Sequence, residues 1–199
     1  LDVEATCAVL ETLRHCGAHT EAASWGGLRR AADALFAMQE PDGGFARFER
    51  GESEVPISRM PWRDADELSH ERADDSARLE RSAVALRELH ALGWRLEDDR
   101  VTRGVNFLGR AVTEQGRTMA TATLAQALRA LAHVCPQGHP ARDAAERELR
   151  TRQSERGDFG DRVSTARALR ALTALGEACV QSRRAARWLA TNTPRPQRE

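Results

Sequence analysis

Two groups of cysteine and histidine contain the residue types that could bind a metal ion. The first comprises His15, Cys16 and His19, and the second comprises His133, Cys135 and His139. Thiolates and imidazoles are the usual ligands of zinc, but these spacings match no standard zinc module. Each group falls at the expected C-terminal end of a helix, where a histidine is also stabilised by the helix dipole. We therefore predict neither a metal nor a cofactor.

The composition argues against several classes of protein. The chain has 199 residues, with 30 basic and 30 acidic side chains, and its formal net charge of zero gives no support for a nucleic-acid-binding surface. No apolar run approaches the roughly 20 residues that a membrane-spanning helix needs, and no secretory signal is visible. Because the chain begins with Leu1 inside a regular pattern, we expect a fragment of a longer protein. Because no secretory signal is visible, we expect that protein to be cytoplasmic.

Hydrophobic periodicity predicts an all-α fold. Apolar residues from Leu28 to Leu35, and again from Val101 to Val112, recur at the i, i+3, i+4, i+7 spacing of one helix face. Helices are predicted near residues 3–14, 27–39, 74–92, 98–113, 119–134, 140–153, 163–178 and 182–191. We predict one domain over residues 1–192, a long polar loop over residues 40–73, and a disordered tail over residues 193–199.

Internal repeats indicate how these helices are arranged. Residues 125–131 match residues 166–172 with one substitution, and both Gln39–Phe45 and Gln153–Phe159 read Q-x-x-x-G-x-F. Repetition of this length is typical of stacked helical hairpins. Alternate helices, beginning with the first, are rich in small and aliphatic residues, so we expect them to form an inner layer beneath more polar outer helices.

The two Q-x-x-x-G-x-F segments resemble the QW repeats of squalene–hopene and oxidosqualene cyclases, the class II terpene cyclases. Residues 38–48, 60–64 and 73–80 are similar to three further segments of that family, in the same order along the chain. The resemblance covers residues 1 to about 191 and implies an α/α toroid, of which this chain supplies an incomplete arc of about four helix pairs.

The sequence also departs from the family pattern. Phe45 and Phe159 stand where the repeat has tryptophan, and Val112 and Thr193 replace the glutamine in two other copies. In the intact copies, the glutamine is expected to satisfy backbone groups at a helix end, while the aromatic ring packs against the next outer helix.

The resemblance further implies an acid site at the start of the first helix. Class II cyclases protonate an alkene or epoxide with the middle aspartate of a D-x-D-D motif. Here Glu4 stands in the position of that acid, Asp2 precedes it, and Ala5 replaces the last carboxylate. Arg78 stands at the position expected for a partnering His or Arg, with Asp74 one turn before it. A simpler interpretation is that the acidic residues complement the helix dipole and that Asp74 and Arg78 form a surface pair.

Aromatic side chains that could stabilise a carbocation are few. The resemblance places Phe45, Phe48 and Trp62 near the substrate, with Trp94 as a further aromatic, although aromatic residues make up only 5% of the chain. Each of these rings can instead have a structural role, and Trp62 can equally anchor its loop.

Three functions remain open at this point. The first is proton-initiated cyclisation of squalene or a related isoprenoid by a domain with a degenerate acid motif. The second is a non-catalytic α/α-toroid scaffold that binds lipid or protein partners. The third, a zinc-dependent prenyltransferase β-subunit, ranks lowest because no convincing D-x-C motif is present. The expected ligand is an isoprenoid or another lipid, and the resemblance leaves peripheral association with the inner face of the membrane open.

Overall fold

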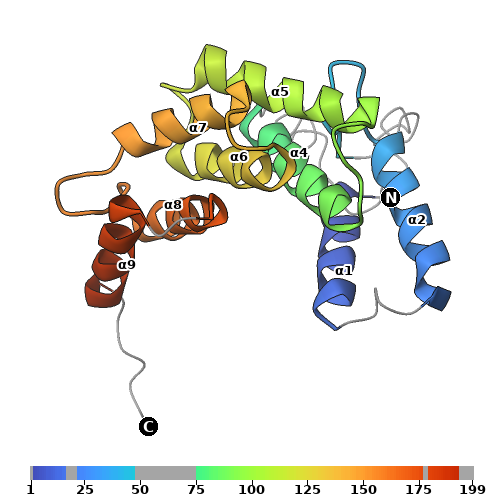
Figure 1. Ribbon diagram of the computed structural model, residues 1–199, viewed down its shortest axis with the longest axis horizontal. Coiled ribbons are helices and arrows are strands. Elements are labelled where there is room, and N and C mark those ends of the chain that lie inside the picture. Colours follow the sequence, from blue (N-terminus) through green and yellow to red (C-terminus); the bar gives the residue numbers. More distant parts are fainter. Residues whose placement is uncertain (1, 17–21, 48–74, 177–178, 193–199) are drawn as a thin grey trace, which may run out of the picture. The chain divides into compact units, whose positions relative to one another are not determined.

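The computed structural model describes residues 2–16, 22–47, 75–176 and 179–192, without the side chains of residues 22–25 (Figure 1). These residues form eight α-helices and no strand; isolated bridges pair Gln39 with Phe45 and Phe159 with Asp161. The predicted all-α fold is therefore confirmed. The chain divides into two compact units, Leu1–Arg110 and Ala111–Glu199.

The first unit contains α1 (Val3–His15), α2 (Ala22–Ala37), α4 (Asp75–Ala91) and most of α5 (Asp99–Gln115). Helix α1 packs against both α2 and α4. The largest side chains that are fully buried in this unit are Leu35, Met38, Phe45, Leu86, Glu88, Leu89 and Leu108. All of these except Glu88 are apolar, and they form the core that holds the helices of this unit together.

The second unit contains the end of α5, followed by α6 (Thr121–Val134), α7 (Pro140–Thr151), α8 (Arg162–Ala174) and α9 (Val180–Asn192). Helix α6 packs on α7 and α8, and α8 packs on α9. The buried side chain of Arg142 donates hydrogen bonds to the carbonyls of Cys135 and Leu175, at the C-terminal ends of α6 and α8. The partial negative charge of two helix ends thus offsets a buried cation that has no carboxylate partner within the described residues.

Burial distinguishes the inner helices from the outer helices of the second unit. In α6, eight residues from Thr123 to Val134 are buried, whereas in α9 only Ser182 and Ala185 are buried. A helix packed on several sides must bury more than one face, which explains why α6 is rich in alanine and leucine. This agrees with the inner and outer layers expected from the sequence.

The helix boundaries differ slightly from those expected. Helix α2 begins at Ala22 rather than near residue 27, and α8 ends at Ala174 rather than near residue 178. The early end of α8 follows from Gly176, whose φ of 91° lies in the left-handed region and cannot continue a right-handed helix. Residues 48–73 of the expected loop and the expected tail, residues 193–199, lie outside the described residues.

The two Q-x-x-x-G-x-F segments have the same geometry in the two units. The side-chain amide of Gln39 donates to the carbonyls of Gly43 at 3.0 Å and Arg100 at 2.8 Å. That of Gln153 donates to the carbonyls of Gly157 at 3.0 Å and Gln181 at 2.9 Å. Each glutamine therefore joins the turn after one outer helix to the first turn of the next.

The aromatic residue of each segment connects the turn to an inner helix. Phe45 is fully buried, and its backbone N–H donates to the Ser82 hydroxyl of α4 at 2.9 Å. Phe159 is 3% exposed, and its N–H donates to the Thr165 hydroxyl of α8 at 3.0 Å. Each segment thus ties an outer helix, the next outer helix and an inner helix together at one point.

Candidate functional site

The expected acid site lies at the start of α1, where Asp2 is the N-cap residue. Its Oδ1 accepts hydrogen bonds from the backbone N–H groups of Glu4 at 2.8 Å and Ala5 at 3.2 Å. Its Oδ2 accepts a hydrogen bond of 3.0 Å from Nε of Arg47. Both oxygens are engaged in holding the helix start and the chain after the G-x-F turn, so Asp2 positions the site.

The environment of Asp2 favours its ionised form. Partial burial by itself raises the pKa of this carboxyl, but the hydrogen bonds from Arg47 and from the N–H groups of Ala5 and Glu4 lower it by more. The pKa of Asp2 therefore lies below its ordinary value. A carboxyl held in this way is a poor proton donor, and within the motif this leaves Glu4 as the candidate acid.

Glu4 faces a cation from the neighbouring helix α4. Its Oε1 lies 3.9 Å from Nη1 of Arg81, and its side chain is 61% exposed, whereas that of Arg81 is only 8% exposed. Nε of Arg81 is buried and has no hydrogen-bond partner among the described residues. A buried guanidinium with such sparse pairing is available to stabilise a carboxylate beside it.

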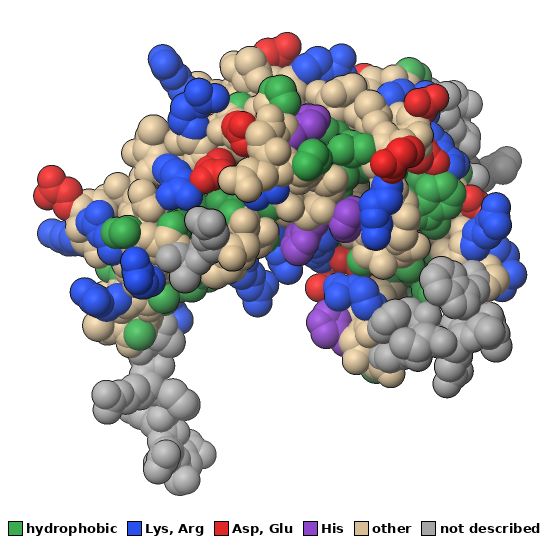
Figure 2. All heavy atoms as spheres, viewed as in Figure 1, with side chains coloured by type: hydrophobic (Ala, Val, Ile, Leu, Met, Phe, Trp, Pro, Cys, Tyr) green, Lys and Arg blue, Asp and Glu red, His purple; other side chains and the backbone are tan. Residues whose placement is uncertain are grey.

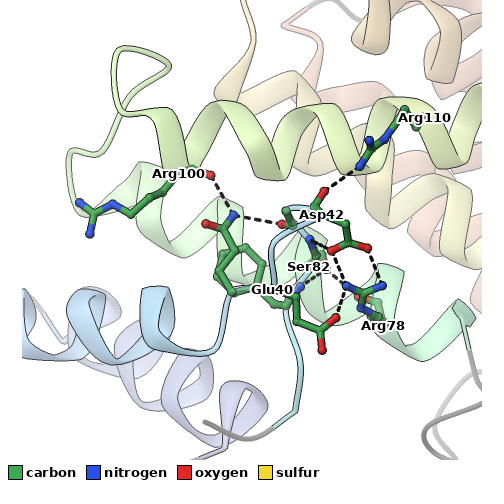
Figure 3. A network of polar contacts seen from close by, with 10 residues as sticks. Glu40, Asp42, Arg78, Ser82, Arg100 and Arg110 are labelled. Carbon is green, nitrogen blue, oxygen red and sulfur yellow. Dashed lines mark hydrogen bonds and ion pairs between the residues drawn. The ribbon is translucent and has the colours of Figure 1, made fainter. Parts of the chain in front are cut away.

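Arg78, which the resemblance places beside the acid, makes its ion pairs elsewhere (Figure 3). Its Nη1 donates to Oδ2 of Asp42 at 2.9 Å, its Nη2 donates to Oδ1 of Asp42 at 2.6 Å, and it also pairs with Glu40. The guanidinium lies 4.7 Å from the ring centre of Phe107, and Arg110 donates to the backbone carbonyl of Asp42. Arg78 thus fixes the turn that contains the first G-x-F segment.

A repeated hydroxyl contact shows why these two arginines differ. The hydroxyls of Thr6, Ser82 and Thr165 donate to the carbonyls of the residues four positions earlier, which are Asp2, Arg78 and Asp161. Each hydroxyl residue also precedes a glycine by eleven positions. When α1, α4 and α8 are aligned on this hydroxyl residue, Arg78 occupies the position of the capping residues Asp2 and Asp161. Arg81 then occupies the position of Ala5 in α1.

Arg81 is therefore the residue near the site that the sequence analysis did not single out. The sequence does contain a signal for this alignment of the inner helices. Ser82 precedes Gly93 by eleven positions, and the same spacing separates Thr6 from Gly17 and Thr165 from Gly176. Helix α4 begins at Asp75, one turn before the position at which an aspartate caps α1 and α8. Arg78 thus lies inside a helix rather than at its cap.

Of the aromatic residues that were expected near a substrate or named beside them, Phe45 and Trp94 are among the described residues. Phe45 is fully buried beneath its turn and belongs to the core of the first unit. Trp94 stands edge-on to Phe36 with ring centres 5.1 Å apart, and the Arg100 guanidinium lies over both rings. Phe48 and Trp62, together with the acidic residue Asp74, lie outside the described residues.

A buried carboxylate at the contact between α1 and α4 was also not anticipated. The side chain of Glu88 is 1% exposed, and its Oε1 accepts hydrogen bonds from Nε and Nη2 of Arg87 at 3.0 and 2.9 Å. Nε of Arg14 lies 3.7 Å from Oε2. Burial raises the pKa of the nearby Cys7 thiol to about 12, and the negative charge of Glu88 adds to this effect. Cys7 is therefore an inert core residue.

The cysteine and histidine groups do not assemble into a metal site within the described part of the chain. Nδ1 of His15 lies 2.7 Å from the carbonyl of Glu11, and His139 caps α7 by accepting from the N–H of Ala141. Burial raises the pKa of the Cys135 thiol to about 11. His19 lies outside the described residues.

Fold and repeats together define an all-helical protein built from hairpins that glutamine and aromatic segments tie together. The squalene–hopene cyclase C-terminal domain family matches residues 1–178, and the chain belongs to that family. No curated protein and no solved structure matches the chain significantly. Among the described residues, no helix is both long enough and apolar enough to span a bilayer.

Proposed function

We propose that this chain is the acid-bearing domain of a terpene cyclase-like protein that protonates squalene or a related isoprenoid through Glu4. The observation that carries the proposal is the pairing of Glu4 with the buried Arg81 at the start of α1, in a member of the squalene–hopene cyclase family. Asp2 is held ionised as the helix cap, which leaves Glu4 as the carboxyl in the motif that is free to donate a proton.

The proposed step moves one proton. The O–H bond of the Glu4 carboxyl breaks, a C–H bond forms at one alkene carbon, and the adjacent carbon becomes a cation that the next double bond attacks. Arg81 lies 3.9 Å from the Glu4 carboxyl, beyond hydrogen-bond distance, so it stabilises the carboxylate that remains without the direct hydrogen bond by which Arg47 holds Asp2 ionised. A final deprotonation or addition of water ends the cascade, and solvent returns a proton to Glu4.

Analysis of products by mass spectrometry tests this proposal. The longest native form of the protein is incubated separately with squalene and with geranylgeranyl diphosphate, in detergent, and the extracts are compared with boiled enzyme. Cyclic isomers or their hydrated forms identify a class II cyclase and name its substrate class. Recovery of unchanged substrate from folded protein contradicts the proposal.

A non-catalytic scaffold that binds lipid or protein partners is the second candidate. The observation in its favour is that Ala5 supplies no second carboxyl, while Glu4 is largely exposed rather than enclosed in a dry cavity. This candidate predicts saturable binding of squalene, measured by quenching of tryptophan fluorescence, without any product. Binding that is accompanied by turnover excludes it.

A further inference from the structure

The large hydrophobic side chains that are exposed lie on the first helix and on the last two helices of the described residues. They are Val9 and Leu13 of α1, Val163 of α8 and Val180 of α9. In a stack of repeats, neighbours cover each internal repeat on both sides, whereas a terminal repeat needs a polar cap to stay soluble. Apolar side chains exposed on the first and last helices therefore indicate uncapped ends.

The exposed side of α1 corresponds to a buried side of α4 and α8. When the three helices are aligned on their shared hydroxyl residue, the matched sets are Val9 with Ala85 and Ala168, and Leu13 with Leu89 and Leu172. The residues of α4 and α8 in these sets are all 0% exposed, whereas Val9 and Leu13 are 58% and 38% exposed. The α1 face denotes Ala5, Val9, Thr12 and Leu13, which are all exposed.

Helix α4 uses this side to pack on α1. Arg81 of α4 lies 3.9 Å from Glu4 of α1, and Glu88 of α4 lies 3.7 Å from Arg14 of α1. In the alignment, these two residues of α4 match members of the α1 face. Helix α1 thus exposes the same side that α4 turns toward the inner helix before it.

Helix α8 exposes the opposite side. Helix α1 receives α4 through the charged side chains of Glu4, Glu11 and Arg14. The matching positions of α8 are Val163, Arg170 and Thr173, which are all exposed and are named the α8 face. The chain therefore carries an open α8 face that corresponds to the receiving side of α1, and an open α1 face that corresponds to the packing side of α4.

The two faces belong to units of opposite charge. Residues 1–110 contain 15 arginines and 21 acidic residues, whereas residues 111–199 contain 15 arginines and 9 acidic residues. Helix α8 carries three arginines and no acidic residue, and Figure 2 shows basic side chains over the neighbouring helix that Figure 1 labels α9. Opposite charges of this kind favour the encounter and orientation of two copies.

We propose that the α8 face of one copy docks on the α1 face of a second copy of this chain. The contact repeats the packing of α4 on α1, with α8 in the place of α1 and the second copy's α1 in the place of α4. By equivalence with the three ion pairs between α1 and α4, the expected contacts are Val163 with Ala5, Arg170 with Glu11, and Thr173 with Thr12. Each contact is complementary, since it joins two apolar groups, opposite charges or two hydroxyls.

A contact of this kind is heterologous, because the two copies contribute different surfaces. The copies at either end keep one open face each, so association continues into a ring or a longer chain. A second copy is the occupant because one chain carries both faces on units of complementary charge.

Sedimentation velocity of the longest native form tests the proposal without any substrate. Association is expected as the protein concentration rises from about 1 to about 100 µM. Val9→Asp and Val163→Asp each place a charge in one face and should weaken self-association at least about tenfold. An equal mixture of the two variants should form a species of two chains and nothing larger, because each copy retains one working face.

Val180→Asp is the matched control, because Val180 is 58% exposed and lies outside both faces. This variant should self-associate like the native form, and circular dichroism checks that all three variants are folded. The proposal is overturned by a native form that stays monomeric, which would assign the open faces to a different partner. Unchanged association in either face variant, a monomeric mixture, or equal weakening by Val180→Asp also overturns it. No turnover is measured, so failure of the proposed function is detected separately.

Discussion

Gln39 and Arg100 are joined by a hydrogen bond of 2.8 Å between the side-chain amide of the first and the backbone carbonyl of the second, 61 residues later. This bond ties the end of one outer helix to the start of the next, and Gln153 makes the equivalent bond to Gln181 in the second unit. The same local chemistry thus stabilises two different hairpin junctions.

Removal of either glutamine should destabilise its unit. Gln39→Ala or Gln153→Ala leaves two carbonyls without their donor, and each is expected to lower the free energy of unfolding by about 2 kcal/mol. Urea unfolding followed by circular dichroism measures the change. Gln115→Ala, at an exposed position, is the control and should alter stability by less than about 0.5 kcal/mol. An equal loss of unfolding free energy at all three positions would contradict a stabilising role for the hydrogen bonds of Gln39 and Gln153.

The glycine of each segment is required by a close approach as well as by its conformation. Gly43 has a φ of 97°, and a Cβ there would lie 2.1 Å from the carbonyl oxygen of Arg103. At Gly138 φ is 84°, but a Cβ would have no neighbour within 4 Å. Gly138→Ala should therefore cost about 1 kcal/mol from strain alone, whereas Gly43→Ala should cost clearly more.

Thermal unfolding of the two glycine variants measures this difference directly. The variant at Gly43 should have the lower midpoint. Similar midpoints would mean that the turn shifts away from α5 without loss of stability, contrary to the tight junction described above.

The turn geometry was largely predictable from sequence, whereas the partner of Glu4 was not. Two copies of Q-x-x-x-G-x-F indicated equivalent junctions, and periodicity placed all eight described helices. The family-like stretch around Arg78 suggested a cationic partner there, but Arg78 lies one turn inside α4, which begins at Asp75 as expected, and it pairs with Asp42 instead. Only the contact between helices shows that Arg81 lies beside Glu4.

Acid should weaken the fold through Asp2 and Asp42. Burial raises the pKa of both carboxyls, but hydrogen bonds from Arg47 to Asp2 and from Arg78 to Asp42 lower it by more, so both values lie below the ordinary one. Their contribution to stability is therefore complete above the pKa of the unfolded chain, about 3.9, and is lost as pH falls through the lower folded value.

Urea unfolding between pH 7 and pH 3 tests this pH dependence. Asp2→Asn preserves a capping side chain but removes the charge that pairs with Arg47, so stability should fall less steeply with acid than in the native chain. Asp143→Asn, at an exposed position in α7, is the matched control and should leave the slope unchanged. An unchanged slope in Asp2→Asn would contradict the inferred pKa.

The two arginines of α4 should have separable effects. Arg81→Met fills the buried space without a charge and should lower kcat at least tenfold with little change in stability, because Glu4 loses its cationic neighbour. Arg81→Lys should restore part of kcat. Arg78→Met should lower stability by about 1 kcal/mol, since its partners are partly exposed, and should leave kcat unchanged. Steady-state kinetics and urea unfolding on the same preparations separate the two roles.

The most direct test of Glu4 as the acid is a comparison of Glu4→Gln with Glu11→Gln in the longest native form of the protein. Both variants remove one carboxyl from α1, and only the first removes the one paired with Arg81. Product formed from squalene is quantified by mass spectrometry after a fixed time. We predict that cyclic product disappears in Glu4→Gln and persists in Glu11→Gln, whereas unchanged turnover in Glu4→Gln would contradict the assignment of Glu4 as the proton donor.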